Sequence, residues 1–344
     1  MTIIDKKTHL DNVTKLLKTI GSPFIKEEHY NPSEEEIKQL YHYARKNRMG
    51  YYFLHVLHGR GILPQALKEE YNRETQRYNK ILEVMTQVSK DLEEEGIEYA
   101  IYKSIRPYPS TTVDIDIIIY NDYEKAYLTL RKKGYPLLGL GPETITLQDP
   151  ARTVGIDLYR EIAVSRIIYL DKWKLRNHKT KIKLPTGYAT TLTPEADIIA
   201  VVAHLAVKEQ IFTLADYYTI LHHLKHVNPN IIYKLARETK TETPLHLTLT
   251  LTTILHQKAH NKPPIPHEHI TNIIYDEARK LMNGQVELPI KIGPKTLTSI
   301  FIEKLVREEK ARKSIAVQAK YLTRRSYLRF FMEQLISHIA RETY

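Results

Sequence analysis

Cysteine is absent from this chain of 344 residues, and glycine is scarce, with 12. Without thiols the protein has no disulfide bonds, thiolate zinc sites, iron–sulfur clusters or cysteine nucleophile. The longest apolar stretch, 196–207, contains Asp197 and His204 and is shorter than the roughly 20 residues of a membrane span. The first residues lack the basic and apolar regions of a signal peptide. We therefore expect a soluble, cytoplasmic protein with no membrane partner.

Acidic residues are outnumbered, with 40 Asp and Glu against 51 Lys and Arg and a net charge of +11. This balance favours a polyanionic partner or substrate. Residues 1–100 carry 15 basic and 16 acidic side chains, so the whole excess lies beyond residue 100. We therefore interpret the N-terminal part as packing helices and not as a polyanion-binding region. The abundance of Lys, Ile and Glu is typical of thermophilic proteins.

The last 44 residues carry 10 basic and 5 acidic side chains. Basic and aromatic residues are interleaved there, and they include Lys304, Arg307, Lys310, Arg312, Lys313, Lys320, Tyr321, Arg324, Arg325, Tyr327, Arg329, Phe330 and Phe331. Such a segment is typical of a surface that binds RNA or an acidic protein. It is equally typical of an amphipathic helix that packs on the core and holds its cations in solvent. The sequence leaves both interpretations open.

Helical periodicity flanks a shorter segment with strand periodicity. Helices are predicted over 9–20, 33–47, 51–57, 65–96 and 123–133, and strands over 97–102, 113–120, 144–148 and 153–160. Further along the chain, a turn is predicted at 184–187 and a helix start at 193–195. Helices then continue to about 282, with breaks at 228–229 and 261–266. A strand-like segment at 287–292 and one or two basic helices follow. The predicted fold class is therefore α+β, with a small mixed sheet at 97–190 between helical regions at 1–96 and 191–344.

Two aspartates lie two residues apart in the strand predicted over 113–120. Alternate residues of a strand point to the same face, so Asp114 and Asp116 present their carboxylates together. Among apolar neighbours these groups repel each other and lose hydration unless a cation lies between them. Asp157 has the same apolar strand setting, although Asp149 and Asp171 are alternatives to it. Three such carboxylates favour Mg²⁺ or Mn²⁺ and a two-metal site for in-line phosphoryl displacement.

The segment Ile101-Tyr102-Lys103-Ser104 precedes this strand, and nine residues separate Ser104 from Asp114. A strand, a turn with serine, a hydrophobic-Asp-hydrophobic-Asp-hydrophobic strand and a later hydrophobic-Asp-hydrophobic segment resemble the DNA polymerase β-type nucleotidyltransferase superfamily. The chain is most similar to the branch of uncharacterised bacterial and archaeal nucleotidyltransferases, which have Lys-Gly where this chain has Lys103-Ser104. The resemblance covers about residues 65–225, and the motif lies within 101–159.

This resemblance implies a small mixed-sheet nucleotidyltransferase core and roles for individual residues. Asp114, Asp116 and Asp157 would bind two Mg²⁺ or Mn²⁺ ions, and Asp157 would also help to deprotonate the acceptor. The candidate nucleotide-binding residues are Lys103, Ser104, Arg106, Lys208 and Asp216. The last two lie in segments 203–208 and 214–221, which look like the helices that follow the third acid in that branch.

The expected function is transfer of NMP from an NTP to a hydroxyl acceptor, with release of pyrophosphate. Positive charge beyond residue 100 favours RNA, such as tRNA, or a protein as the acceptor over a small cation. The alternative is a catalytically inactive scaffold of the same fold that binds nucleic acid or a protein partner. Two histidine groups, at 222–226 and 267–269, lack a well-spaced third ligand, so structural roles are favoured over zinc binding.

Overall fold

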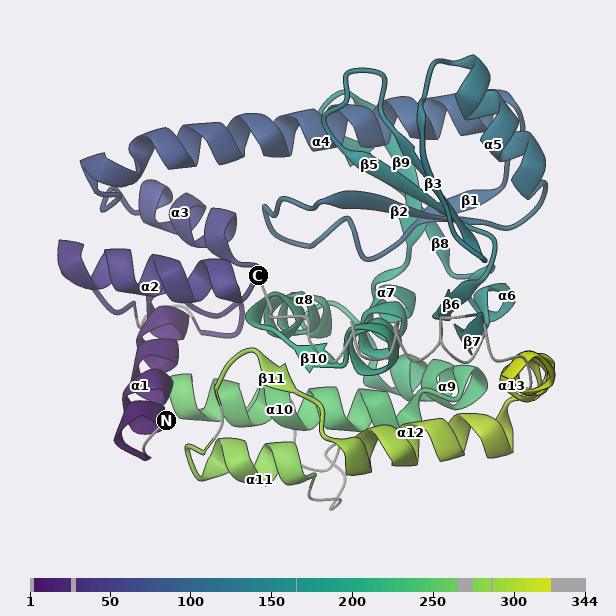
Figure 1. Cartoon of the computed structure of the whole chain (residues 1–344). Helices are drawn as coiled ribbons and strands as arrows, with labels where there is room; N and C mark the ends of the chain where they lie inside the picture. Colours follow the sequence, from purple (N-terminus) through teal and green to yellow (C-terminus); the bar gives the residue numbers. More distant parts are fainter. Residues whose placement is uncertain (1–2, 26–28, 165, 265–274, 286, 323–344) are drawn as a thin grey trace.

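The computed structural model describes residues 3–25, 29–164, 166–264, 275–285 and 287–322. These residues form an α+β protein in which helices surround a mixed sheet (Figure 1), so the predicted fold class is confirmed. The basic tail from residue 323 onward, including Arg324, Arg325 and Arg329, lies outside the described residues. Within the described residues, no helix has both the length and the apolar composition needed to cross a bilayer.

The central sheet has seven strands in the order β3-β4-β5-β2-β1-β9-β8. Their bounds are β1 (Tyr99–Ile101), β2 (Asp114–Ile119), β3 (Leu137–Leu140), β4 (Thr144–Gln148), β5 (Gly155–Tyr159), β8 (Lys179–Leu184) and β9 (Gly187–Leu192). Strand β2 runs parallel to β5 and antiparallel to β1, and β1 runs parallel to β9. The sheet is therefore mixed, with β2 near its centre.

Strand β2 divides its side chains between two hydrophobic cores. Ile115 and Ile117 belong to one core with the inner face of α4 (Lys68–Glu94). Ile118 and Tyr120 belong to the other core, with α7 (Pro194–Ala203) and the helices after it. Because strand residues alternate between faces, the even-numbered residues, which include the two aspartates, lie on the side of the C-terminal helices.

Helices α4 and α5 (Tyr123–Lys132) cover the first face of the sheet, and the C-terminal helices lie beyond the second (Figure 1). The C-terminal elements are η2 (His204–Glu209), β10 (Ile211–Phe212), α8 (Leu214–Leu224), α9 (Pro229–Thr239), α10 (Glu242–His260), α11 (Asp276–Met282), β11 (Ile290–Lys291), α12 (Pro294–Arg307) and α13 (Glu309–Leu322). The N-terminal elements are α1 (Ile3–Ile20), α2 (Glu34–Lys46), α3 (Gly50–Gly59) and η1 (Gln65–Leu67). N- and C-terminal helices share one core, in which α1 packs against α10.

Most predicted elements are present close to their expected bounds. Ser33 begins α2 with a capping box, and Thr193 and Pro194 begin α7, as the sequence predicts. The sequence did not predict β3, β8 or β9. It also did not predict the two-stranded sheet of β6 (Ile162–Val164) and β7 (Ile167–Leu170), next to the one-turn helix α6 (Lys172–Leu175). The predicted turn at 184–187 joins β8 and β9 into a hairpin.

Candidate active site

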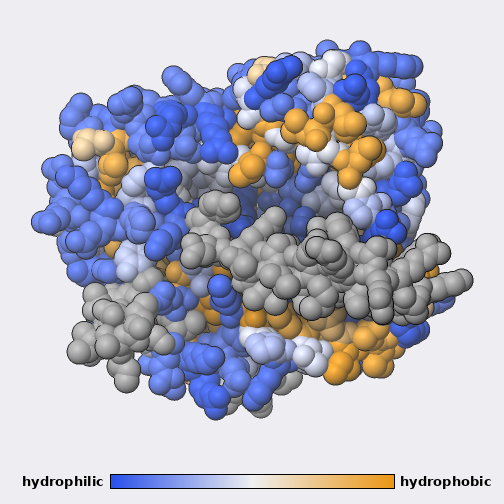
Figure 2. Space-filling view, in the orientation of Figure 1, coloured by the Kyte–Doolittle hydropathy of each residue, from blue (hydrophilic) through white to orange (hydrophobic). Residues whose placement is uncertain are grey.

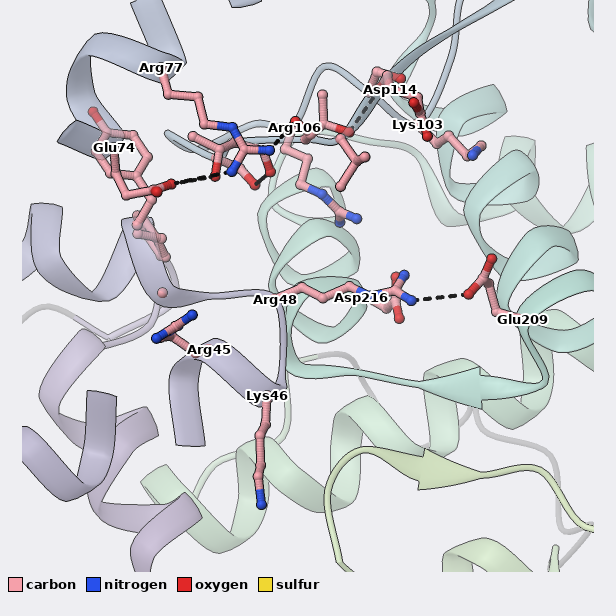
Figure 3. A pocket seen from close by; sticks show the side chains of 18 of the residues that line it. Arg45, Lys46, Arg48, Glu74, Arg77, Lys103, Arg106, Asp114, Glu209 and Asp216 are labelled. Atoms are coloured by element: carbon pink, nitrogen blue, oxygen red, sulfur yellow. Dashed lines mark hydrogen bonds and ion pairs between the residues drawn. The ribbon is translucent and has the colours of Figure 1, made fainter. Parts of the chain in front are cut away.

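One large cavity, of about 930 Å³, opens between the sheet, the C-terminal helices and the N-terminal helices (Figure 3). Strands β2 and β5 contribute the three predicted aspartates to its lining. The segment 103–113, which connects β1 to β2, lines it as well, together with η2 and the start of α8. All eight site residues predicted from the sequence line this cavity, although their interactions differ.

Asp116 lies at the buried end of the site, with 5% of its surface exposed. Its Oδ2 is 2.8 Å from Lys103 Nζ and accepts a hydrogen bond of 3.0 Å from Ser104 Oγ. The Asp116 amide in turn donates to Ser104 Oγ at 2.9 Å. Burial opposes ionisation of Asp116, but the charge and hydrogen bond of Lys103 outweigh it, and the pKa of Asp116 lies below its ordinary value. This carboxylate is therefore held as an anion.

Asp114 is half-buried at the start of β2 and depends on a glycine in the neighbouring strand. Its side chain accepts no hydrogen bond and forms no ion pair within the described part of the chain. A Cβ atom at Gly155 would lie 2.3 Å from Asp114 Oδ1, so only glycine leaves room for this carboxylate. Burial, followed by the charges of Asp157 and Asp116, raises the pKa of Asp114.

Asp157 stands opposite Asp116 in the parallel pairing of β2 and β5. Thr146 Oγ1 on β4 donates a hydrogen bond of 2.6 Å to Asp157 Oδ1. Burial raises the pKa of Asp157, and the hydrogen bond from Thr146 opposes this effect. The two alternatives lie elsewhere: Asp149 accepts amide hydrogen bonds within the loop before β5, and Asp171 caps α6.

The turn at Lys103 and Ser104 achieves its shape without a glycine. Lys103 itself has a φ of +50°, a left-handed conformation that favours glycine. Asp197 Oδ1 accepts a hydrogen bond of 3.0 Å from the Lys103 amide, and Asp197 Oδ2 is 3.1 Å from His223 Nε2. Buried Asp197 therefore positions this turn, and His223 has Asp197 as its partner.

The segment η2 is a π-helix, a local variant that is frequent at functional sites. It brings His204, Lys208 and Glu209 to the cavity. Burial, followed by the charge of Lys103, lowers the pKa of Lys208, whose Nζ is 3.2 Å from the hydroxyl of Tyr159. The charge of Lys208 therefore lies near the aspartates, which neutralise it only in part.

Neutral His204 links η2 to two other parts of the molecule. Burial, followed by the charge of Lys103, lowers the pKa of His204 to about 3. The neutral ring then donates from Nε2 to Glu209, 3.3 Å away, and accepts at Nδ1 from the Tyr169 hydroxyl, 3.1 Å away. Glu209 also pairs with Arg48 at 3.0 Å. These contacts connect the site to the N-terminal helices (Figure 3).

Arg106 and Asp216, the two remaining predicted contacts, have structural partners. Arg106 Nη1 donates to the carbonyl of Ala215 at 3.0 Å and to the hydroxyl of Thr219. Asp216 Oδ2 accepts from the Thr213 amide and hydroxyl at 3.0 and 2.7 Å, in the capping box of α8. Both side chains line the cavity, and in Figure 3 the Arg106 guanidinium points into it.

The sequence analysis missed a group of cations at the same cavity. They come from the end of α2, the turn between α2 and α3 and the first half of α4, and they are Arg45, Lys46, Arg48, Arg73 and Arg77. The net charge of residues 1–100 gave no signal for them, because acidic residues elsewhere in this region cancel their charge. The histidines at 267–269 lie outside the described residues, so their predicted structural role stays a prediction.

The carboxylates do not form a ready-made metal cage. Among the described residues, no three His, Cys, Asp or Glu side chains are arranged to hold an ion by themselves. Mg²⁺ typically binds one or two protein carboxylates and completes its shell with water and substrate phosphates, so a cage is not required. The unpartnered carboxylate of Asp114 and its repulsion from two other aspartates fit such a cation.

Comparison with known proteins identifies the class. Residues 33–257, about two thirds of the chain, match a family described as an uncharacterised nucleotidyltransferase. The chain belongs to this family, and the resemblance to nucleotidyltransferases is confirmed. The narrower assignment to the branch with Lys-Gly before Asp-x-Asp stays a prediction.

Two further comparisons give no information about the function. A crystal structure of an antigenic nucleotidyltransferase-like protein from Paracoccidioides brasiliensis is similar at 14% identity and a TM-score of 0.32, over 48% of this chain and 91% of that chain. No curated protein sequence matches the chain.

Proposed function

We propose that the protein transfers NMP from an NTP to a hydroxyl acceptor in a reaction that depends on Mg²⁺ or Mn²⁺. The observation that carries this proposal is the convergence of Asp114, Asp116 and Asp157 from two parallel strands on one cavity. Membership of a nucleotidyltransferase family supports it independently. Asp114, Asp116 and Asp157 would hold the divalent ion, which supplies positive charge for the phosphate oxygens and the attacking oxygen.

The chain's own side chains suit the remaining steps. Lys103 and Lys208 lie beside the aspartates and can bind the triphosphate, and the Ser104 hydroxyl would exchange its bond to Asp116 for one to a phosphate oxygen. Asp157, which stands opposite Asp116 on the neighbouring strand, would take the acceptor's proton. A bond then forms between the acceptor oxygen and the α-phosphorus. The bond from the α-phosphorus to the β-phosphate oxygen breaks, and pyrophosphate leaves.

The test is label transfer from each α-labelled NTP, with Mg²⁺ or Mn²⁺, to total RNA and to total protein. Asp114→Asn keeps the shape of the side chain and removes its charge, so we expect roughly a 1000-fold loss of transfer, a scale set by losing one electrostatic contact to the transition state. Asp122→Asn is the matched control, because Asp122 caps α5 away from the cavity and Asn caps equally well.

Wild-type protein that transfers no label, or an Asp114→Asn variant as active as Asp122→Asn, would contradict the proposal. Nucleic-acid or protein binding without transfer would then favour the scaffold alternative. Nucleotide binding measured by Mn²⁺-dependent quenching of a fluorescent NTP gives a second readout. We expect it to weaken in Asp114→Asn and to persist in Asp122→Asn.

A further inference from the structure

The cavity has a second side whose charge is opposite to that of the aspartates. We call Arg45, Lys46, Arg48, Arg73 and Arg77 the basic wall; all five line the cavity and are exposed to solvent. Among the described residues of the same helices, only two carboxylates, Glu70 and Glu74, line the cavity. In Figure 3, Arg45 and Arg77 lie on the side opposite Asp114 and Lys103. Hydrophilic side chains dominate this face of the molecule over α2 and α3 (Figure 2).

The charge of the basic wall is largely available to a ligand. Arg45 and Lys46 form no ion pair within the described residues. Arg48, Arg73 and Arg77 pair with the largely buried carboxylates of Glu209, Glu70 and Glu74, but 45–65% of each arginine side chain stays exposed. Ion pairs that are open to solvent on one side contribute little energy, so these arginines stay accessible to a phosphate. A polyanion would therefore meet exposed cations here, two of which, Arg45 and Lys46, have no carboxylate partner among the described residues.

Aromatic rings accompany these cations. The Arg45 guanidinium lies over the Tyr41 ring, 5.9 Å from its centroid. Gly50 makes this possible, because a Cβ atom there would lie 3.0 Å from Arg45 Cγ. Tyr52 also lines the cavity, and it is half-buried like Tyr41. Arginine beside tyrosine is the combination that holds backbone phosphates and stacks bases of single strands.

The basic wall is tied directly to the catalytic strand. Arg77 Nη2 donates a hydrogen bond of 3.1 Å to the carbonyl of Thr112, and Thr111 Oγ1 donates to Glu74 at 3.1 Å. Thr112 is two residues from Asp114. A chain that follows the basic wall therefore reaches the aspartates at its end.

We propose that the basic wall binds a single-stranded polynucleotide whose terminal hydroxyl is the acceptor. This inference rests on the proposed function, which leaves the acceptor open. Repeated phosphodiesters match several spaced cations, and bases match the rings of Tyr41 and Tyr52. An acidic protein segment would use the cations alone, whereas a nucleic acid would also contact the parts of Tyr41 and Tyr52 that line the cavity beside their contacts with Arg45 and Tyr108, so the observations favour nucleic acid. RNA and DNA share this chemistry, and the experiment separates them.

The experiment measures binding of a fluorescent 12-nucleotide RNA, and of DNA of the same sequence, to the full chain by anisotropy. Arg45→Gln/Lys46→Gln removes two cations that have no ion pair. Each phosphate contact to a single strand contributes about 0.7 to the slope of log Kd against log salt, so this variant should lower the slope by about 1.4. We expect binding at low salt to weaken at least 10-fold. Lys38→Gln/Lys68→Gln, exposed cations of α2 and α4 outside the cavity, is the matched control and should bind like wild type.

Separate outcomes decide the two proposals. Equal oligonucleotide binding by the wall variant and its control overturns the inference, as does transfer of label to protein and not to either oligonucleotide. Label transfer to the RNA oligonucleotide or to the DNA oligonucleotide shows which of the two is the acceptor. An Asp114→Asn protein that binds the oligonucleotide normally but transfers nothing supports both proposals. Normal salt-dependent binding with no transfer by wild type rejects the proposed function and retains the basic wall as a nucleic-acid site.

Discussion

The two sides of the cavity place charge in different ways. On the sheet, buried Asp116 and half-buried Asp114 are fixed by strand register and by contacts to Lys103 and Ser104. On the basic wall, Arg45 and Lys46 are exposed at the end of a helix. The interaction energies of buried charges change strongly with small displacements, because the low local dielectric strengthens each interaction. The interactions of exposed charges are weakened by salt. One side is therefore suited to chemistry and the other to holding a long anionic partner.

Among changes that leave the aspartates themselves in place, the largest expected effect comes from disturbing the sheet side of the cavity alone. In Gly155→Ala, the new methyl group would lie 2.3 Å from Asp114 Oδ1, so the carboxylate must move. A displacement of about 1 Å at a reacting centre costs roughly 100-fold in rate, and we expect a loss of transfer on this scale. Oligonucleotide binding should stay at the wild-type level, because the basic wall is untouched.

Gly139→Ala is the control for this variant. Gly139 also lies in a strand of the central sheet and has no positive φ, and a Cβ atom added to it would meet no described atom within 4 Å. Transfer by Gly139→Ala should therefore match wild type. If Gly155→Ala retained full transfer, the position of the Asp114 carboxylate would not matter, and the assignment of Asp114 would be wrong.

Sequence periodicity was enough to predict that Asp114 and Asp116 share one face of a strand. Alternation in the segment 113–120 placed Asp114 and Asp116 on one face, and β2 shows the same alternation of buried faces. The pairing of Asp116 with Asp157 could not be derived in this way, because it depends on a parallel register between strands about 40 residues apart. Hence Asp149 and Asp171 remained alternatives until the strands were paired.

Charge counting failed for the basic wall for a physical reason. The sum over residues 1–100 is near zero, but tertiary contacts separate the signs. Glu93, Glu94 and Glu98 lie at or just beyond the far end of α4, where they pair with Lys181, Lys133 and Arg176 of the sheet region. The cations of α2 and of the first half of α4 are left at the cavity. A net charge carries no information about such a separation along one long helix.

His204, which connects the sheet side of the cavity to the N-terminal helices, makes the stability of the protein depend on pH. The pKa of His204 is about 3 in the folded protein, below its ordinary 6.5. Between these values the unfolded state binds more protons, so His204 lowers stability as the pH falls from 6.5 to 3. We expect His204→Gln to reduce the slope of unfolding free energy against pH in this window, by up to about 1.4 kcal/mol per pH unit. Urea denaturation at a series of pH values measures the slope.

His58→Gln is the control for this measurement, at an exposed histidine of α3. It is expected to retain the wild-type slope. A His204→Gln slope equal to that of His58→Gln would mean that the His204 ring binds a proton in the folded protein as easily as in the unfolded chain. The description of a neutral His204 between Glu209 and Tyr169 would then be incorrect.

The smallest expected effect comes from removing the direct hydrogen bond between the basic wall and the loop that leads into β2. Arg77→Gln removes the hydrogen bond to the Thr112 carbonyl and costs about 1 kcal/mol of stability. We expect transfer to an oligonucleotide to fall about 5-fold, since the loop before Asp114 loses one anchor and a single strand loses one phosphate contact. Arg131→Gln removes a similar hydrogen bond to the Tyr135 carbonyl, remote from the cavity, and should lower stability alone. Equal transfer by both variants would show that the two sides work without this tie.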